Sequence, residues 1–350
     1  MKLPGVRELW SRSCSAGLML ALVLGAVLLP LEMIADRQGR ASGITTHTPS
    51  VSPSASPVVR APLQAAPRRA SRARTTVPEG EEIFSGLGAW LDLYDLNLDV
   101  ATTVARLKGV GVRTLYVQTG RSITARAIDA RVGRWIRAAH RSGIAVVGWY
   151  LPYYTDIRRD VARTSVIARA VFGGERFDGL GVDIEYRDAV PRLGLWNRNV
   201  RLHLSLVRRE VGSDFPVAAI TPTPLQMQVA GQYWAGFPWK AIARYSDAVL
   251  LMSYWSDRTG CPQIVLHCAY EFTKANVELT RLATGRADVR VHVIGGVGSE
   301  ITTSDVAGFV RGARDANAYG ASVYDVATTR GAWWRRLRVL RTLGEASPSG

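Results

Sequence analysis

Two acidic residues at the end of one apolar run carry the clearest chemistry in this sequence. The run from Phe177 to Glu185 reads Phe-Asp-Gly-Leu-Gly-Val-Asp-Ile-Glu, so Asp183 and Glu185 stand two positions apart. On a strand they would share one face, with α-carbons about 6–7 Å apart. Two carboxyl groups that close push their pKa values apart, so one stays protonated while the other stays ionised. That division of roles suits cleavage of a glycosidic bond through an oxocarbenium-like transition state.

The other residues of the run indicate which way this face points. Leu180, Val182 and Ile184 form the opposite, apolar face and suit packing under helices. The two carboxylates are therefore expected to point to the inside of the sheet. The alternative role for them is structural, as a buried ion pair with an arginine such as Arg187.

The rest of residues 83–343 predicts the fold that positions this run. Short apolar runs alternate with longer segments of helical period, the pattern of repeated βαβ units. The expected strands are 87–94, 113–119, 144–150, 179–185, 216–221, 248–254, 291–297 and 321–325. The expected helices lie near 98–108, 127–142, 156–172, 195–211, 238–244, 270–284, 303–318 and 332–343. This strict alternation predicts an α/β fold, a (β/α)8 TIM barrel. An open doubly wound sheet is the runner-up, but its G-x-G-x-x-G fingerprint does not follow the first strand.

Catalytic side chains of such barrels lie at the C-terminal ends of the strands, where the loops form a mouth. The expected strand ends therefore indicate further residues that bind the substrate: Asp92, Gln118, Tyr150, Tyr254, Trp255 and Tyr324. Aromatic rings stack on the apolar face of a sugar. The tryptophans available for such stacking are Trp90, Trp149, Trp234 and Trp255. For each tryptophan, and for Tyr254, core packing is the alternative role.

Two motifs carry a resemblance to a known family. The run from Asp178 to Glu185, Asp-Gly-x-x-x-Asp-x-Glu, resembles the strand-four signature of family 18 glycoside hydrolases, the chitinase group. Met-Ser-Tyr at 252–254 is similar to that family's strand-six motif. The resemblance implies that Glu185 is the proton donor, that Asp183 orients the substrate's acetamido group, and that Tyr254 hydrogen-bonds near the scissile sugar. The paired carboxylates also resemble those of family 25 muramidases.

The chain departs from the family 18 pattern at two positions. The family has an aspartate where this chain has Gly181, and another where it has Trp255. These departures motivate an alternative function, a non-catalytic carbohydrate-binding barrel derived from a glycosidase. A third hypothesis is a phosphorylated ligand bound at the glycine turn of residues 295–298, which export from the cytoplasm argues against.

The N-terminal part of the chain indicates export. In residues 1–36, basic residues precede an apolar run from Ala16 to Leu31, the pattern of a signal peptide or of an uncleaved signal anchor. Residues 37–80 are rich in Ser, Thr, Pro, Ala and Arg and predict a disordered linker. The barrel at 83–343 is therefore expected to be secreted, or anchored at the outer face of the cytoplasmic membrane by a tether.

Charge and cysteines narrow the expected ligands. The net charge is +15, and part of it lies in the linker, which either follows an anionic membrane or wall polymer or is simply solvated. Cys261 and Cys268 are expected to form a disulfide that closes a short loop. A metal site there is the alternative, but His267 is a poor third ligand. We expect no metal, no cofactor and no nucleic-acid partner, and a monomer.

These observations predict one principal activity. We expect an exported glycoside hydrolase that cleaves a polysaccharide or oligosaccharide of the cell envelope or the environment by carboxylate acid/base catalysis, with Glu185 and Asp183 as the catalytic pair.

Overall fold

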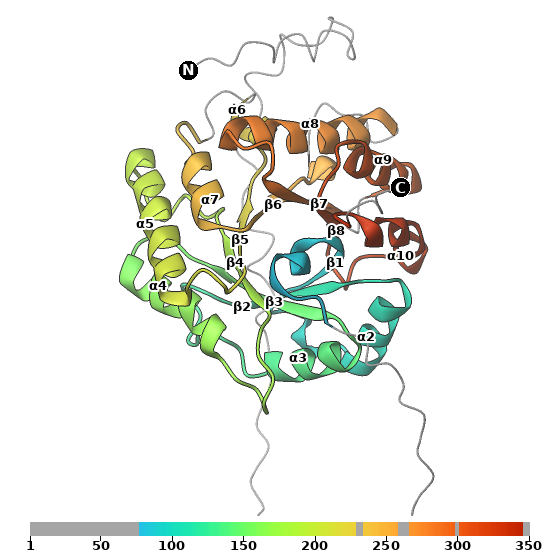
Figure 1. Cartoon of the computed structure of the whole chain (residues 1–350), viewed down its shortest axis with the longest axis horizontal. Coiled ribbons are helices and arrows are strands. Elements are labelled where there is room, and N and C mark those ends of the chain that lie inside the picture. The colour runs from blue at the N-terminus through green and yellow to red at the C-terminus, as the bar shows by residue number, and fades with distance from the viewer. Residues whose placement is uncertain (1–76, 229–233, 258–265, 298–300, 346–350) are drawn as a thin grey trace, which may run out of the picture. The chain divides into compact units, whose positions relative to one another are not determined.

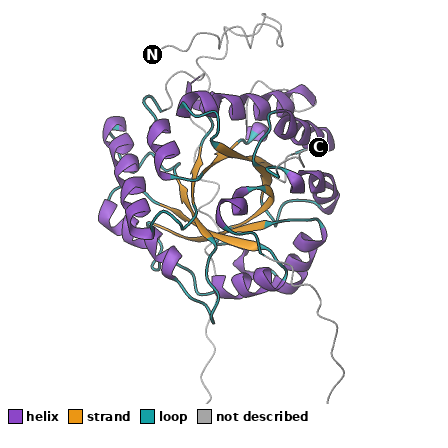
Figure 2. Ribbon diagram, viewed as in Figure 1, coloured by secondary structure: helices purple, strands orange, loops and turns teal. Residues whose placement is uncertain are grey.

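The computed structural model describes residues 77–228, 234–257, 266–297 and 301–345. Eight parallel strands form a closed barrel in which each strand pairs with the next and the last pairs with the first (Figure 2). The strands are β1 (Gly86–Leu91), β2 (Thr114–Arg121), β3 (Ala145–Leu151), β4 (Gly179–Asp183), β5 (Val217–Thr221), β6 (Ala248–Met252), β7 (Arg290–Val297) and β8 (Gly320–Tyr324). The (β/α)8 TIM barrel expected from the sequence is confirmed.

Helices surround the ring of strands (Figure 1). They are α2 (Val100–Gly109), α3 (Val132–Arg141), α4 (Ile157–Ser165), α5 (Leu193–Val211), α6 (Pro224–Gln228), α7 (Trp239–Tyr245), α8 (Leu266–Thr284), α9 (Thr303–Asp315) and α10 (Gly331–Leu337). Short 3-10 helices complete the chain: η2 (Gly80–Phe84), η3 (Asp95–Asn97), η4 (Val166–Arg169), η5 (Trp255–Asp257) and η6 (Arg338–Thr342). Within the described residues, no helix has both the length and the apolar character to cross a membrane.

Local side-chain caps explain where several helices begin. Asp99 accepts a hydrogen bond from the backbone of Thr102 at the start of α2, and Asp156 does the same for α4. Thr302 and Asp305 form a reciprocal capping box at the start of α9. The expected helix at 127–142 begins later, at Val132, and those at 156–172 and 332–343 continue from α4 and α10 as 3-10 helices. The short helix α6 was not expected.

The barrel separates two apolar cores. Leu180, Val182 and Ile184 pack in the layer between strands and helices, as their spacing predicts. A smaller cluster fills the inside of the barrel and includes Trp90, Tyr116 and Trp149. The residues of β4 that alternate with the apolar set therefore face the barrel interior.

The short helix η2 closes the end of the barrel at which the strands begin, here called the floor. It is the blue helical turn inside the ring in Figure 1. Phe84 of η2 is fully buried, and its carbonyl oxygen lies 2.9 Å from Nδ1 of His292. The Nε2 atom of the same ring lies 2.9 Å from the Ser322 hydroxyl, which accepts a 2.7 Å hydrogen bond from Nε1 of Trp90. Burial lowers the pKa of His292 to about 4. The ring is therefore neutral, with Nδ1 donating to Phe84 and Nε2 accepting from Ser322.

Some sequence predictions lie outside the described residues. The signal segment at 1–36 and nearly all of the linker at 37–80 belong to this part. Cys261 and the side chain of Cys268 lie there too, so their disulfide stays a prediction.

Candidate active site

Asp183 is the last residue of β4 and lies inside the mouth of the barrel, the end at which the strands finish. It pairs in register with Ile220 of β5, whose side chain belongs to the inner core. The Asp183 side chain is 4% exposed. Among the described residues, its Oδ1 atom has no hydrogen-bond partner. A buried oxygen of this kind is costly to leave unpaired, and it is free to bind a group that enters from the mouth.

Glu185 follows Asp183 beyond the end of the strand. The expected strand at 179–185 is two residues too long, because β4 ends at Asp183. Ile184 still donates its backbone N–H to Ile220, at 2.8 Å, and its side chain packs outward. Glu185 is exposed, so solvent reaches it directly while Asp183 stays buried.

Both carboxyl groups hold their protons more firmly than ordinary acids. Burial raises the pKa of Asp183 well above its usual value, and the charge of Glu185 raises it further. Desolvation by the surrounding barrel also raises the pKa of Glu185. The guanidinium of Arg121 opposes both increases. Because solvent screens the exposed Glu185, Asp183 is the more firmly protonated of the two.

Arg121, at the end of β2, was not among the predicted site residues. Plain alternation along β2 puts Arg121 on the face opposite to Gln118. The register with β3 instead shifts, so that Gln118 pairs with Trp149 and Arg121 pairs with Leu151, two residues further along β3. This bulge resets the alternation and turns Arg121 to the inner side. Gly120 inside an otherwise regular strand is the sequence signal of such a bulge.

Tyrosines surround Arg121 at the mouth. Its Nη2 atom donates to the Tyr94 hydroxyl at 3.0 Å, and its guanidinium lies 5.6 Å from the centre of the same ring. Tyr153, in the loop after β3, also lies beside Arg121, whose charge opposes the rise that burial causes in the pKa of Tyr153. Tyr153 stacks on Tyr186 with ring centres 4.0 Å apart. The loops after β1, β3 and β4 thus bring three tyrosines to one side of the mouth.

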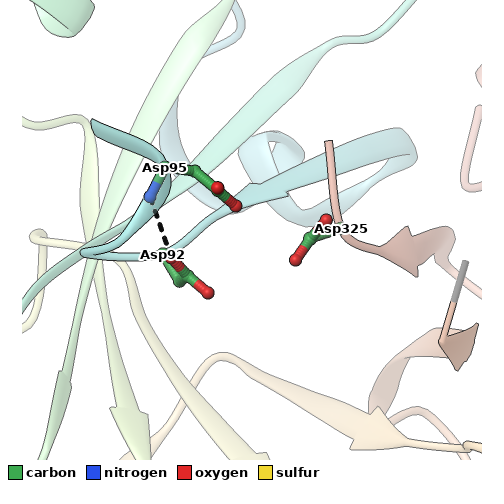
Figure 3. Close-up of side chains that lie close together, drawn as sticks. All are labelled: Asp92, Asp95 and Asp325. Carbon is green, nitrogen blue, oxygen red and sulfur yellow. Dashed lines mark hydrogen bonds between the residues drawn. The ribbon is translucent and has the colours of Figure 1, made fainter. Parts of the chain in front are cut away.

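Three aspartates gather where β1 and β8 end (Figure 3). Asp92, Asp95 and Asp325 can each offer a carboxylate oxygen within 4.8 Å of the others. Asp92 accepts hydrogen bonds from the backbone of Tyr94 at 2.7 Å and of Asp95 at 3.1 Å, and from the Tyr324 hydroxyl at 3.2 Å. Burial raises the pKa of Asp95 to about 6, and the charges of Asp92 and Asp325 add to the rise. Carboxylate oxygens suit a hard cation such as calcium, and these three are the described residues that could hold one.

Four of the predicted substrate-binding residues lie at this end of the barrel. Asp92 and Tyr324 are joined by the hydrogen bond just described, and the ring of Tyr254 lies 6.1 Å from that of Tyr324. Gln118 is buried, and its Oε1 atom accepts from the backbone of Leu93 at 3.2 Å. A chain of contacts therefore links the ends of β1, β2, β6 and β8.

Tyr150 lies outside this group, although the sequence placed it at the cleft. Its ring packs in the layer between strands and helices, and its hydroxyl donates to Asp160 of α4 at 3.1 Å. The reason is alternation, because the neighbouring Trp149 points inward. Asp160 also accepts from the Ser122 hydroxyl at 2.6 Å and from the backbone of Tyr154 at 2.9 Å. Tyr150 therefore anchors the loop after β3 and does not line the mouth.

Trp255 also faces the helix layer. It opens η5, and its ring lies 5.0 Å from that of Phe309 on α9. A Cβ atom added to Gly295 would lie 2.6 Å from the Trp255 ring, and one added to Gly296 would lie 3.2 Å from it. The glycines at the end of β7 thus make room for this indole, which gives them a packing role.

Of the remaining tryptophans, Trp149 lies beside Gly181 inside the barrel. Trp149 points into the barrel, is 5% exposed, and has no partner for Nε1 among the described residues. A Cβ on Gly181 would lie 3.1 Å from that of Trp149 and 3.0 Å from the Ile220 side chain. These two side chains occupy the space beside the position where family 18 has its middle aspartate. Trp90 belongs to the floor network, and Trp234 stacks on Trp196 outside the barrel, with ring centres 5.0 Å apart.

Known structures share this architecture. The chain is similar to an endo-β-1,4-mannanase from Thermotoga petrophila, with a TM-score of 0.56 and 12% identity over 75% of this chain and 78% of the other. It is also similar to a chitinase from Chromobacterium violaceum (TM-score 0.52, 12% identity, 75% and 99% covered). A family 18 N-acetylglucosaminidase from Paenibacillus barengoltzii gives a TM-score of 0.53 at 12% identity, with 74% and 99% covered. The shared feature is the fold.

The expected resemblance to family 18 is thus confirmed at the level of the barrel. No protein-family model matches the chain, and no curated protein matches it.

Proposed function

We propose that this protein is a glycoside hydrolase that acts on a polysaccharide or oligosaccharide, with Glu185 as proton donor and Asp183 as its partner. The observation that carries the proposal is the buried, unpartnered oxygen of Asp183 beside Glu185 at the mouth of a TIM barrel. Active sites of this fold lie at that end. The glycosidase names of the similar structures support the same reaction class.

The two carboxyl groups divide the work by depth. Glu185 reaches the solvent-filled mouth and can deliver its proton to the oxygen of the glycosidic bond. The carboxylate left on Glu185 then faces the positive charge that develops on the sugar ring. It takes a proton from the water that attacks the anomeric carbon, so that the new C–O bond forms and Glu185 regains its proton. Asp183 keeps its proton in the buried position and holds a polar group of the substrate through its unpartnered oxygen. The raised pKa of Glu185 keeps this acid protonated at a higher pH than an ordinary glutamate.

The test measures new reducing ends released by the full-length protein from chitin, peptidoglycan, α- and β-glucans and galactosaminoglycans. We expect Glu185→Gln to lower the rate at least about 100-fold, because the amide has no proton to deliver. Glu271→Gln is the matched control, since Glu271 is exposed on α8. An unimpaired Glu185→Gln protein would contradict the assignment.

A non-catalytic carbohydrate-binding barrel is the second candidate. It is favoured by Trp149 and Ile220, which occupy the space beside Gly181 where the resembled family has an acid. This function predicts measurable sugar affinity without cleavage, and affinity unchanged by Glu185→Gln.

We also infer export, with the barrel secreted or tethered outside the cytoplasmic membrane as a monomer. This proposal rests on the pattern of residues 1–36, which precede the described part. Fractionation of cells that produce the full chain tests the location, and protein found only in the cytoplasm would contradict it.

A further inference from the structure

Arg121 carries a positive charge at the mouth with neutral partners. Its side chain donates hydrogen bonds to the Tyr94 hydroxyl and to the side chain of Tyr153, and the centre of the Tyr94 ring lies 5.6 Å from its guanidinium. Some other arginines of the described chain form ion pairs with carboxylates, for example Arg131 with Asp129 at 2.8 Å and Arg208 with Asp247 at 2.6 Å. Within the described residues, no carboxylate forms such an ion pair with Arg121. A guanidinium has five N–H donors, so donors remain for a ligand.

The backbone aims Arg121 and holds it there. The bulge at β2 turns the residue to the inner side of the barrel. Its backbone N–H donates to the Thr124 hydroxyl at 3.2 Å, and that hydroxyl donates back to the Arg121 carbonyl at 2.8 Å. Arg163 of α4 also donates to Thr124, both to its carbonyl at 2.8 Å and to its hydroxyl at 2.9 Å. The end of β2 is therefore fixed by side chains from two further segments.

The surroundings fit a charged sugar. Tyr94, Tyr153 and Tyr186 give flat, partly exposed aromatic surface beside the guanidinium, which suits the apolar face of a pyranose. The bulge turns Arg121 to the inner side of the barrel, where Asp183 also faces, and the charge of Arg121 lowers the pKa of both Asp183 and Glu185. The aspartates at the ends of β1 and β8 would repel an anionic group, which leaves the Arg121 side of the mouth as its place.

We propose that Arg121 binds the carboxylate of a sugar unit next to the cleaved bond, so that the substrate is an acidic glycan built from uronic acids. This inference rests on the proposed function and names its substrate class. A planar guanidinium pairs with a planar carboxylate through two parallel hydrogen bonds, which makes the contact specific. The net charge of +15 supports the same class, because a positive protein concentrates an anionic polymer around it.

The test measures binding in the full-length Glu185→Gln background, so that nothing is cleaved. The probes are four uronic acid hexasaccharides (from hyaluronan, polygalacturonate, alginate and heparosan) and their carboxyl-reduced counterparts. We expect at least one acidic probe to bind, with an affinity at least tenfold above its reduced form. Arg121→Gln should abolish that preference by weakening the acidic probe at least tenfold and the reduced form less than twofold. Arg126→Gln, an exposed arginine on the following loop, is the matched control.

Each other outcome overturns the inference. It is wrong if no acidic probe binds, if acidic and reduced probes bind equally, or if Arg121→Gln weakens both alike. It is also wrong if Arg121→Gln, with Glu185 intact, shifts the pH profile of cleavage while the affinity for acidic probes is unchanged, since Arg121 then only tunes the carboxyl groups. Acidic probes that bind but are never cut would overturn the proposed hydrolase and leave the Arg121 site standing.

Discussion

The two ends of the barrel treat buried polar groups in opposite ways. From the floor upward, the ring of His292, the hydroxyl of Ser322 and the indole of Trp90 satisfy one another and the carbonyl of Phe84. At the mouth, Oδ1 of Asp183 and Nε1 of Trp149 are buried without partners among the described residues. An unsatisfied buried polar atom costs about 1–3 kcal/mol. The chain accepts that cost at the end where a ligand can supply the missing hydrogen bonds.

The largest expected effect is on catalysis at the mouth. Asp183→Asn should lower kcat about 100-fold or more, because the amide keeps the shape but replaces the carboxylic acid that holds the substrate beside Glu185. The same change should leave the free energy of unfolding equal or higher, since it removes the cost of a buried acid. Reducing-end kinetics and urea unfolding of one preparation measure both. A large loss of stability with kcat unchanged would show that Asp183 has a structural and not a catalytic role.

Next in size is the stability of the floor. Ser322→Ala removes the hydroxyl that joins Trp90 to His292 and leaves two buried nitrogens without partners. The free energy of unfolding should fall by about 2 kcal/mol or more. Catalysis per folded molecule should not change. Ser205→Ala, on the outer helix α5, is the control, because its hydroxyl bonds only to the Leu202 carbonyl of its own helix. A loss of kcat in Ser322→Ala but not in Ser205→Ala would contradict the assignment of stability to the floor and of catalysis to the mouth.

The smallest effect is a pH dependence near the floor. The His140 ring lies 2.7 Å from Glu175 and 2.9 Å from Asp178, which also accepts from the backbone at the start of β3. Burial lowers the pKa of His140, but the hydrogen bonds to Asp178 and Glu175 outweigh it and the net shift is upward from 6.5. The contribution to stability is therefore full below pH 6.5 and is lost as the pH rises through the higher folded-state pKa.

His140→Asn measures this contribution. At pH 5 the free energy of unfolding should be about 1 kcal/mol higher for the wild type than for the variant. The difference is modest because Glu175 is partly exposed. The gap should shrink by pH 9 in urea unfolding experiments. A gap that is constant or grows with pH would show that the ring acts through packing.

The sequence predicted the elements well because each has a strong hydrophobic period. All eight strands lie within three residues of their expected bounds at either end. The inward orientation of Asp183 could be predicted because alternation along an unbulged strand decides which residues face inward. Tyr150 was misplaced because it was chosen as the last residue of a strand, whereas its parity sends it outward. Asp92 was among the predicted residues, but its grouping with Asp95 and Asp325 was not predicted, because it joins the two ends of the barrel across the β1–β8 closure.

The orientation of Arg121 could not be predicted from the sequence alone. A register shift of one residue reverses which side chains face inward, and the pairing that reveals it exists only once β2 and β3 lie side by side. Gly120 hints at a bulge, but glycine in a strand has several causes. Tertiary pairing, and not local propensity, therefore decides which charge reaches the mouth.

The closure of the floor by η2 also constrains the order in which the molecule can assemble. The Phe84 carbonyl meets a ring 208 residues further along the chain, and β1 pairs with β8. Neither contact can form while the chain is still emerging and the last strands are unmade. Contacts this distant in sequence are slow to close. The first segment of the barrel must therefore wait for the last two strands, because His292 lies on β7 and the pairing partner of β1 is β8. A chain that ended before β7 would lack both contacts even with the strand that carries Asp183 already made.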